Sequence, residues 1–414
     1  MKTLSIIQLK SEVELFNFDD HSENDSYLVT YLGKNWKVRK NVHSVLLHLR
    51  SAENFELMLE NLAKKEILVS QEELDVIVSF LKKNGLIVGY EPEASKNKPL
   101  RNKMLWLRLT ILPSKMTKKF EFLAFLFDKL FFIPTAVIFL IWFTSIYLTN
   151  SPSLIGEQLI TLSFIELIMC YIFLVFTGFI HEIGHAVALI KYDEKPGRIG
   201  LGVYFVMPVL FTDVTRVWRL SRMKRTMVDL GGIYFQGLIL LISFTLNELF
   251  IQNHLLFLGM MLSTLTIMGN FNPFIKLDGY WIFSDILGVD DLHKLVKDIL
   301  LCFLNNNRLQ NPLNKFKKNQ KVILIVYTLA TCLFFSYLVM MIFRSLVLGV
   351  QMVHSDLIVL FSERFYHWNL QMNDLFSYLS SRFTIFLVFF FAIRMIYMSF
   401  KKGLRFIKVK KVNR

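Results

Sequence analysis

The sequence predicts a mainly α-helical, polytopic membrane protein with about six spans and a small N-terminal α+β, winged-helix-like cytosolic domain. Its composition is the first reason: 54% of the 414 residues are hydrophobic and 40 are phenylalanine, which is too apolar for an ordinary soluble protein. The second reason is the length of several apolar runs, since roughly 20 residues are needed to cross the hydrocarbon of a bilayer. The third is the turn and helix signals confined to residues 1–93.

Residues 1–93 are expected to form the winged-helix-like domain. Strand-like residues on both sides of Gly33-Lys34-Asn35 predict a β-hairpin over residues 27–39. A capping box at Ser70 and a C-cap at Gly85 delimit the third of three predicted helices. A short strand at residues 86–88 closes the domain. The helices are expected at residues 42–49, 55–64 and 71–83.

This order of elements resembles the PqqD-like peptide-recognition domain of bacterial enzymes that mature ribosomally made peptides. The resemblance covers residues 27–90 and rests on the pattern of elements. It implies that a leader peptide adds as an extra strand to an exposed sheet edge. A winged helix that binds nucleic acid and a structural cap are the alternatives. The acidic residues that lead into the domain, such as Glu12 and Glu14, argue against a DNA footprint, so no nucleic-acid partner is expected.

Residues 94–130 are predicted to be a basic linker, and residues 131–400 to be the membrane domain. Lysine and arginine clusters beside a first span attract anionic lipid headgroups and hold their side in the cytoplasm. The roughly 20-residue requirement for crossing the bilayer then places six spans in the membrane domain. These spans are expected at residues 131–149, 159–180, 228–250, 255–271, 322–343 and 383–400.

Loops rich in lysine and arginine alternate with loops that are short or poor in them. The basic loops are residues 191–225 and 294–321, and residues 401–414 form a basic cytosolic tail. Because basic loops stay on the cytoplasmic side, the chain is predicted to be a multi-pass protein of a bacterial cell membrane with both termini cytoplasmic. The formal net charge of +14 is accounted for by these loops.

The chemistry is expected at His181, Glu182 and His185, an HExxH pattern at the end of the second apolar run. On a helix, His181 and His185 lie one turn apart on the same face, where both can bind one cation. Zinc binds neutral imidazole nitrogens and, at catalytic sites, keeps one position open for water. Glu182 can reach that water without binding the metal. Ionisable residues in a span are costly and usually functional, so a structural histidine pair is the weaker interpretation.

Two imidazoles leave zinc short of a third protein ligand, and Asp278 is the best candidate. It lies shortly after the fourth predicted span. Pro273 breaks the preceding helix, and Gly279 is expected to permit an unusual backbone conformation. Broken helix at membrane depth is tolerated where it lines a cavity. The alternative is that Asp278 merely caps the helix that follows it.

HExxH joined to Asn270-x-x-Pro273-x-x-x-Leu277-Asp278-Gly279 resembles the site-2 protease family of intramembrane zinc metalloproteases. The details around Asn272-Pro273 and Asp278-Gly279-Tyr280 are similar to a branch of peptide zinc metalloproteases from ribosomal-peptide maturation clusters. The resemblance covers residues 159–295. Ile275 departs from it by replacing a familiar second proline, and no PDZ-like or CBS-like insertion is present. The resemblance implies zinc ligands at His181, His185 and Asp278, with Glu182 as the catalytic acid/base.

Two further features are open to more than one interpretation. Asn270 and Asn272 either help to stabilise the oxyanion of the scissile carbonyl or satisfy backbone groups freed by Pro273. Residues 200–211 are apolar but too short to span a membrane easily. They form either a re-entrant segment that presents substrate as an extended strand or an interfacial hairpin.

The predicted function is that of an intramembrane zinc endopeptidase. It would use Zn²⁺ to hydrolyse a peptide bond in a small precursor peptide, during maturation or release of a ribosomally made peptide. Its expected partners are that precursor, the lipid bilayer and peptide-maturation or export proteins. One alternative is regulated intramembrane proteolysis of a membrane-anchored regulator. Another is a non-hydrolytic peptide exporter or immunity protein, against which the intact set of histidines, glutamate and aspartate argues.

Overall fold

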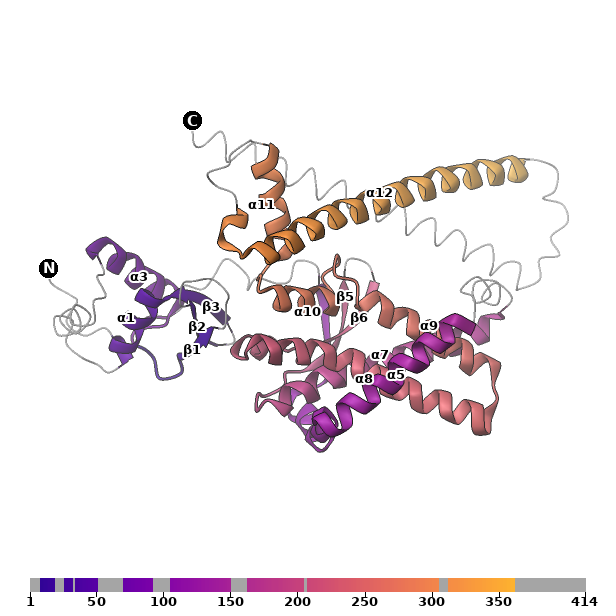
Figure 1. Cartoon of the computed structure of the whole chain (residues 1–414), viewed down its shortest axis with the longest axis horizontal. Helices are drawn as coiled ribbons and strands as arrows, with labels where there is room; N and C mark the ends of the chain where they lie inside the picture. The colour runs from indigo at the N-terminus through magenta and orange to yellow at the C-terminus, as the bar shows by residue number, and fades with distance from the viewer. Residues whose placement is uncertain are drawn as a thin grey trace. The chain divides into compact units, whose positions relative to one another are not determined.

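The computed structural model describes residues 8–18, 26–32, 34–50, 70–91, 105–149, 162–204, 207–304 and 312–361. These residues are mainly helical and include two small antiparallel sheets (Figure 1). The chain divides into two compact units. One consists of Met1–Ser151 and Ile172–Lys315, and the other of Pro152–Tyr171 and Phe316–Arg414.

The first sheet belongs to the N-terminal part of the chain. Its three strands pair antiparallel in sequence order, and the alternate residues of each strand face opposite sides. One side packs on two helices around fully buried Leu46, Leu81 and Leu86. The elements are β1 (Glu14–Phe18), β2 (Ser26–Tyr31), β3 (Lys34–Arg39), α1 (Lys40–Arg50) and α3 (Gln71–Asn84).

The predicted hairpin and the helix after Ser70 are confirmed. Ser70 Oγ accepts a hydrogen bond from the Glu73 amide at 3.2 Å, and the Ser70 amide donates to the Glu73 carboxylate at 3.4 Å. Gly85 ends the helix in the left-handed conformation, with φ of 66°. The predicted helix at residues 55–64 lies outside the described residues, so the winged-helix arrangement stays a prediction.

Two details of this domain differ from the expectation. Strand β1 lies in the lead-in to the domain, which was interpreted only as acidic sequence. The predicted strand at residues 86–88 is wrong, because Ile87 forms only an isolated bridge with Leu9. The chain turns at Gly85 and again at Gly89, both with positive φ, which leaves too few residues for a strand.

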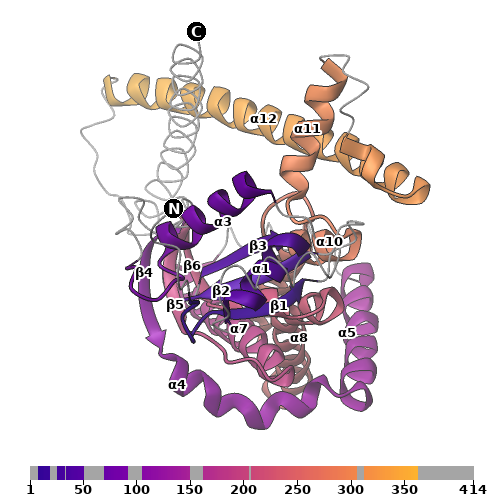
Figure 2. The ribbon, with the colours of Figure 1, turned by 90° about the vertical axis from the view of Figure 1, so that its left-hand side faces the viewer.

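The second sheet pairs segments that lie far apart in the sequence. It has the order β4 (Leu105–Leu112), β5 (Ile199–Tyr204), β6 (Met207–Thr212), and all pairs are antiparallel (Figure 2). Residues 105–112 were expected to be linker and instead form an edge of this sheet. Strands β5 and β6, which lie in the predicted segment 200–211, pair antiparallel, and the position of this segment relative to the membrane stays a prediction. Gly200 permits the close pairing, since a Cβ there would lie 2.3 Å from the Leu109 carbonyl oxygen.

Four helices among the described residues are long and apolar enough to cross a membrane, which indicates a membrane protein. On the first of them Leu140 and Ile141 are 63% and 64% exposed, as expected for side chains that face lipid. The helices are α5 (Lys129–Thr149), α7 (Phe164–Lys191), α8 (Arg222–Leu246, extended by a π-helical turn, Asn247–Ile251) and α12 (Lys318–Phe361).

The predicted number of six spans is not confirmed. Helix α9 (His254–Asn270) corresponds to the fourth predicted span and is apolar, but its 17 residues make it shorter than the other four. The sixth predicted span, residues 383–400, lies outside the described residues. Within the part of the chain that the structure describes, four helices are long enough to span and one apolar helix is shorter.

Helices α7 and α8 approach each other through small residues. A Cβ on Gly184 would lie 2.2 Å from the carbonyl oxygen of Gly231, and a Cβ on Gly231 would lie 2.8 Å from the Cβ of Ala188. Gly184 and Ala188 are one turn apart on α7, a spacing of small residues that allows helices to pack closely in membranes. Because Gly184 lies inside the HExxH pattern, this contact brings both histidines against α8.

The chain turns sharply between α9 and α10 (Asp278–Leu287). The Asn272 side chain accepts a hydrogen bond from the Phe274 amide at 2.8 Å, which stabilises the turn around Pro273. Gly279 does not have a positive φ, so the expected unusual backbone at this position is wrong. Its role is steric instead, because a Cβ there would lie 2.4 Å from the Phe271 backbone.

We predict that Gly184→Ala destabilises the protein by about 1–3 kcal/mol, because the added methyl forces α7 and α8 apart. The measurement is thermal unfolding of the purified protein in detergent. Gly178→Ala is the matched control on the same helix, since its Cβ would meet Leu210 at an ordinary 3.7 Å. Equal melting temperatures for the two variants would contradict the close helix contact.

Candidate metal centre

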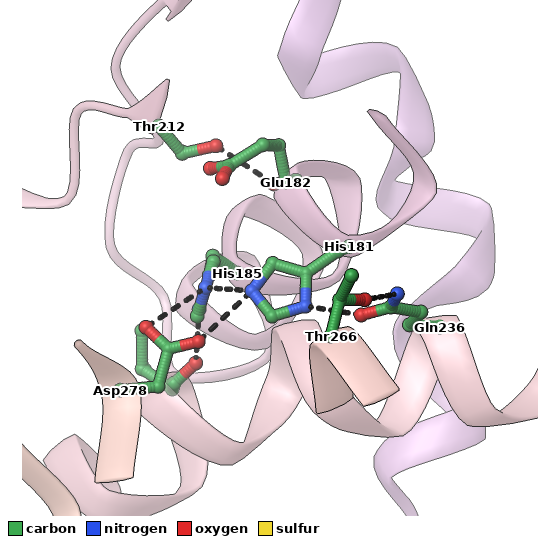
Figure 3. Close-up of polar contacts among 8 residues, drawn as sticks. His181, Glu182, His185, Thr212, Gln236, Thr266 and Asp278 are labelled. Atoms are coloured by element: carbon green, nitrogen blue, oxygen red, sulfur yellow. Dashed lines mark hydrogen bonds and ion pairs between the residues drawn. The ribbon is translucent and has the colours of Figure 1, made fainter. Parts of the chain in front are cut away.

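Helices α7 and α10 bring His181, His185 and Asp278 together. His181 Nε2 lies 2.9 Å from one carboxylate oxygen of Asp278, and His185 Nε2 lies 3.5 Å from the other. The two Nε2 atoms are 3.1 Å apart. Figure 3 shows the three side chains pointing toward one another. All of their ligating atoms fall within 4.8 Å of one another, so the three residues predicted from the sequence as a set do converge in space.

This geometry fits a zinc ion. Ligand atoms bound tetrahedrally at about 2.0–2.2 Å from zinc lie roughly 3.3–3.6 Å from each other. The observed separation of 3.5 Å lies within that range, and the other two, 2.9 and 3.1 Å, are a few tenths of an ångström shorter. Two imidazole nitrogens and one carboxylate oxygen are a donor set that zinc accepts, with a fourth position left for water or substrate. Both histidines are more than nine-tenths buried, which limits the number of competing waters.

Hydrogen bonds from α8 orient both imidazoles. His185 Nδ1 lies 2.8 Å from the Val228 carbonyl oxygen, and His181 Nδ1 lies 3.1 Å from Gln236 Oε1. A carbonyl oxygen can only accept, so each Nδ1 carries the proton and each Nε2 keeps its lone pair. This is the tautomer that binds a metal through Nε2.

Gln236 is a functional residue that the sequence analysis missed. It is only 2% exposed, and its Nε2 donates to Ser263 Oγ at 3.0 Å and to Thr266 Oγ1 at 2.8 Å. The Thr266 hydroxyl donates its proton to the Ser263 carbonyl oxygen at 2.7 Å and can therefore only accept from Gln236, which places the carboxamide oxygen toward His181. Ser263 Oγ lies in turn 2.9 Å from Thr177 Oγ1. The signal in the sequence was a single glutamine within an apolar helix, where an unpaired amide is costly.

Gly232 leaves space beside the two imidazoles. A Cβ at this position would lie 2.5 Å from Nε2 of both His181 and His185. Any side chain there would therefore occupy the volume next to the two atoms that face Asp278. Gly232 was assigned no role from the sequence.

The structure rules out the capping role considered for Asp278. The N-cap of α10 is Leu277, with no side-chain cap, and Asp278 is the first residue of the helix. The loop that precedes Asp278 is tied to the segment after α10, because Lys276 Nζ lies 3.1 Å from the Asp291 carboxylate. Tyr280, which is fully buried, donates to the same carboxylate at 2.9 Å.

The far end of α10 is held by Asp285. Arg225 donates two hydrogen bonds to one oxygen of this carboxylate, from Nε at 2.8 Å and from Nη2 at 2.6 Å. Burial raises the pKa of the Asp285 carboxyl above its ordinary value, although the Arg225 guanidinium acts in the opposite direction. The pair thus links α10 to the first turn of α8.

Glu182 lies outside the cluster of three residues. Figure 3 shows it on the side of Thr212, the last residue of β6. Thr212 Oγ1 donates to the backbone carbonyl of Glu182 at 2.8 Å. This bond attaches the hairpin to the HExxH turn and does not involve the Glu182 carboxylate. Of the two asparagines, Asn272 serves the local turn, and Asn270 is the last residue of α9.

The chain is similar to a protein of Bacillus subtilis (strain 168) named "Putative peptide zinc metalloprotease protein YydH". The two are 25% identical over 186 residues, which is 45% of this chain and 69% of the relative. This similarity supports a zinc metalloprotease. No protein-family model matches the chain, and no solved structure matches it. The relative's name suggests zinc, and the three-residue cluster could hold such an ion.

We predict that Gln236→Met lowers zinc affinity by about 10–100-fold, because it keeps the side-chain length and removes the acceptor for His181. Zinc affinity is measured by competition with a chromogenic chelator. Thr266→Val removes one partner of Gln236 and leaves Ser263 in place, so it is expected to cause a smaller loss. An unchanged affinity in Gln236→Met would show that this hydrogen bond does not orient the imidazole.

Proposed function

We propose that the protein is an intramembrane zinc endopeptidase of the site-2 protease type. The observation that carries this proposal is the convergence of both HExxH histidines with Asp278, which is 93 positions beyond His185 in the sequence. The similarity to a protein named as a peptide zinc metalloprotease supports the same class of chemistry. His181, His185 and Asp278 hold the metal.

The position of the cluster along α7 supports cleavage within the membrane. His181 lies ten residues before Lys191, the last residue of α7, which is about 15 Å along the helix axis. The hydrocarbon core of a bilayer is about 30 Å thick. An α7 that spans the membrane therefore places the cluster inside the hydrocarbon, on the side of the residues 191–225 loop, which we assign to the cytoplasm.

Different residues of this chain have different roles in the proposed hydrolysis. Bound zinc lowers the pKa of water toward neutrality and polarises a carbonyl group. Glu182 takes a proton from the attacking water as the carbon–oxygen bond forms, and returns it to the amine when the peptide bond breaks. Val228 and Gln236 keep the imidazoles in the tautomer that the metal requires. Burial of the histidines keeps excess water away from the reacting groups.

A small precursor peptide is the substrate we favour. The N-terminal sheet, in the order β1-β2-β3, has β1 and β3 as its edges, and an edge strand can add a peptide through backbone hydrogen bonds. The name of the Bacillus relative also refers to a peptide. We propose that a leader peptide binds at this sheet and that the chain works beside peptide-maturation or export proteins. In this proposal the chain has six spans and both termini lie in the cytoplasm.

Glu182→Gln is expected to retain zinc and to lose at least about 100-fold in cleavage rate, because the amide cannot accept the proton of water. The assay compares zinc content and cleavage of candidate precursor peptides, encoded by neighbouring genes, for the purified variant and the wild type. Cleavage of a membrane-anchored regulator in preference to these peptides would favour regulated intramembrane proteolysis. Equal cleavage by both proteins would overturn the role of Glu182.

Asp278→Ala is expected to lower zinc affinity by more than about 100-fold, a larger loss than an outer-shell change causes. Zinc is quantified after the purified variant has been stripped with a chelator and offered the metal again. Glu182→Gln serves as the control with an intact ligand set. If the wild type itself does not take up zinc, the protease proposal is refuted, and the exporter or immunity protein is favoured.

A further inference from the structure

The face of the N-terminal sheet that points away from its own helices is covered by other parts of the same compact unit. Glu14, Phe16 and Phe18 alternate along β1 and share this face, whereas Leu15 packs toward the helices. Lys37 pairs with Leu28, which pairs with Phe16, so Lys37 lies on the same face. We call these four residues, Glu14, Phe16, Phe18 and Lys37, the docking face.

Charged and aromatic groups hold the docking face against the segment before α8. Glu14 forms an ion pair with Arg219, whose side chain is 12% exposed. The Arg219 guanidinium lies 4.7 Å from the centre of the Phe16 ring. Lys37 Nζ lies 2.8 Å from the carboxylate of Asp290, shortly after α10. The face therefore contacts both ends of the segment that runs from α8 to α10.

Phe18 is the residue of the docking face that contacts Arg225 in the first turn of α8. The Arg225 guanidinium lies 5.2 Å from the centre of its ring and 5.5 Å from that of Trp218. The two rings stack on each other with centroids 6.3 Å apart. Phe18 is only 7% exposed and Arg225 only 3%. Phe18 and Trp218 thus both contact the guanidinium that binds Asp285.

The pair formed by Arg225 and Asp285 bears directly on the position of Asp278. Asp278 and Asp285 are seven residues apart on α10, so they share one face of the helix about 10 Å from each other. The Asp278 carboxylate contacts the histidines, and the Asp285 carboxylate pairs with Arg225. These two contacts together set the rotation and the tilt of a ten-residue helix.

We propose that the N-terminal domain is a positioning element of the metal centre. Through the docking face it holds Arg225 and the end of α10, and thereby keeps Asp278 in reach of His181 and His185. Phe18 acts by covering the ion pair between Arg225 and Asp285, and Lys37 acts by pairing with Asp290. This inference rests on the proposed zinc ligation and adds a link between the domain and the site.

The physical reason is the narrow tolerance of a metal site. Ligand distances must stay within about 0.2 Å of their ideal values. Because the two residues belong to one short helix, a displacement at Asp285, about 10 Å away along α10, also displaces Asp278. Loss of the Phe18 ring removes its cation–π contact and admits water to Arg225, which weakens the buried ion pair.

The test compares Phe18→Ala with Phe18→Tyr in the full-length protein. We expect zinc release to an excess of chelator to become about fivefold faster in Phe18→Ala, and to stay near the wild-type rate in Phe18→Tyr, which keeps the ring. Val76→Ala is the control in the same domain, since Val76 is 67% exposed on α3 and off the docking face. Equal release rates for wild type and Phe18→Ala would overturn the proposal.

Charge reversal gives a second and independent readout. Lys37→Glu places two carboxylates together, and we expect faster zinc release, by about two- to threefold. Combining it with Asp290→Lys restores the opposite charges and is expected to return the wild-type rate. If the ion pair between Lys37 and Asp290 only tethers the domain, Lys37→Glu would lower the melting temperature without changing the rate of zinc release. That result would contradict the proposal.

Amide hydrogen exchange in α10 separates this inference from the proposed function. It is measured on metal-free protein, so it does not depend on zinc ligation. Faster exchange of α10 amides in Phe18→Ala than in Val76→Ala would support bracing by the domain. If the wild type binds no zinc, the proposed function is refuted. The exchange measurement still tests whether the N-terminal domain restrains α10. Unchanged exchange in α10 would refute the link.

Discussion

The close contact between α7 and α8 is the constraint on which the rest of the site depends. Helix α7 carries both histidines, and α8 supplies the groups that orient them, Val228 O and Gln236 Oε1. These bonds form only because the two backbones approach through Gly184 and Gly231. The same approach explains Gly232, since a larger residue would collide with both Nε2 atoms. Packing and chemistry therefore select the same small residues.

Placing polar groups in an apolar bundle requires that each of them has a partner. A buried amide or hydroxyl without a hydrogen bond costs about 1–3 kcal/mol. Here Thr177, Ser263, Thr266 and Gln236 satisfy one another and end at His181. The network is thus both a stability requirement and the device that sets the imidazole tautomer. It also connects three helices, α7, α8 and α9, so the orientation of His181 depends on all of them.

The third member of the cluster comes from a helix that has an ion pair near each of its ends. Lys276 and Asp291 pair near the start of α10, and Arg225 and Asp285 pair near its end. Ion pairs at a partly exposed surface contribute little each, whereas the buried Arg225 must keep its partner because an isolated buried charge is costly. Phe18 of the N-terminal domain lies against the Arg225 guanidinium of that pair. Substrate recognition and metal binding would then share one structural framework, which is the basis of the inferred link.

The sequence by itself determined the features that depend on local spacing. The i, i+4 histidines, the capping box at Ser70 and the C-cap at Gly85 are each set by residues within one or two helical turns. Asp278 was found because the break at Pro273 follows an apolar run. Only the tertiary structure decided the features that depend on distant partners. These are the hydrogen bond between Gln236 and His181, the pairing of β4 with β5, and the steric reason for Gly279. Strand β4 pairs with residues about ninety positions away, and no local pattern records such a pairing. The physical reason is that hydrogen-bond and close-packing requirements across helices become visible only once the backbones are placed.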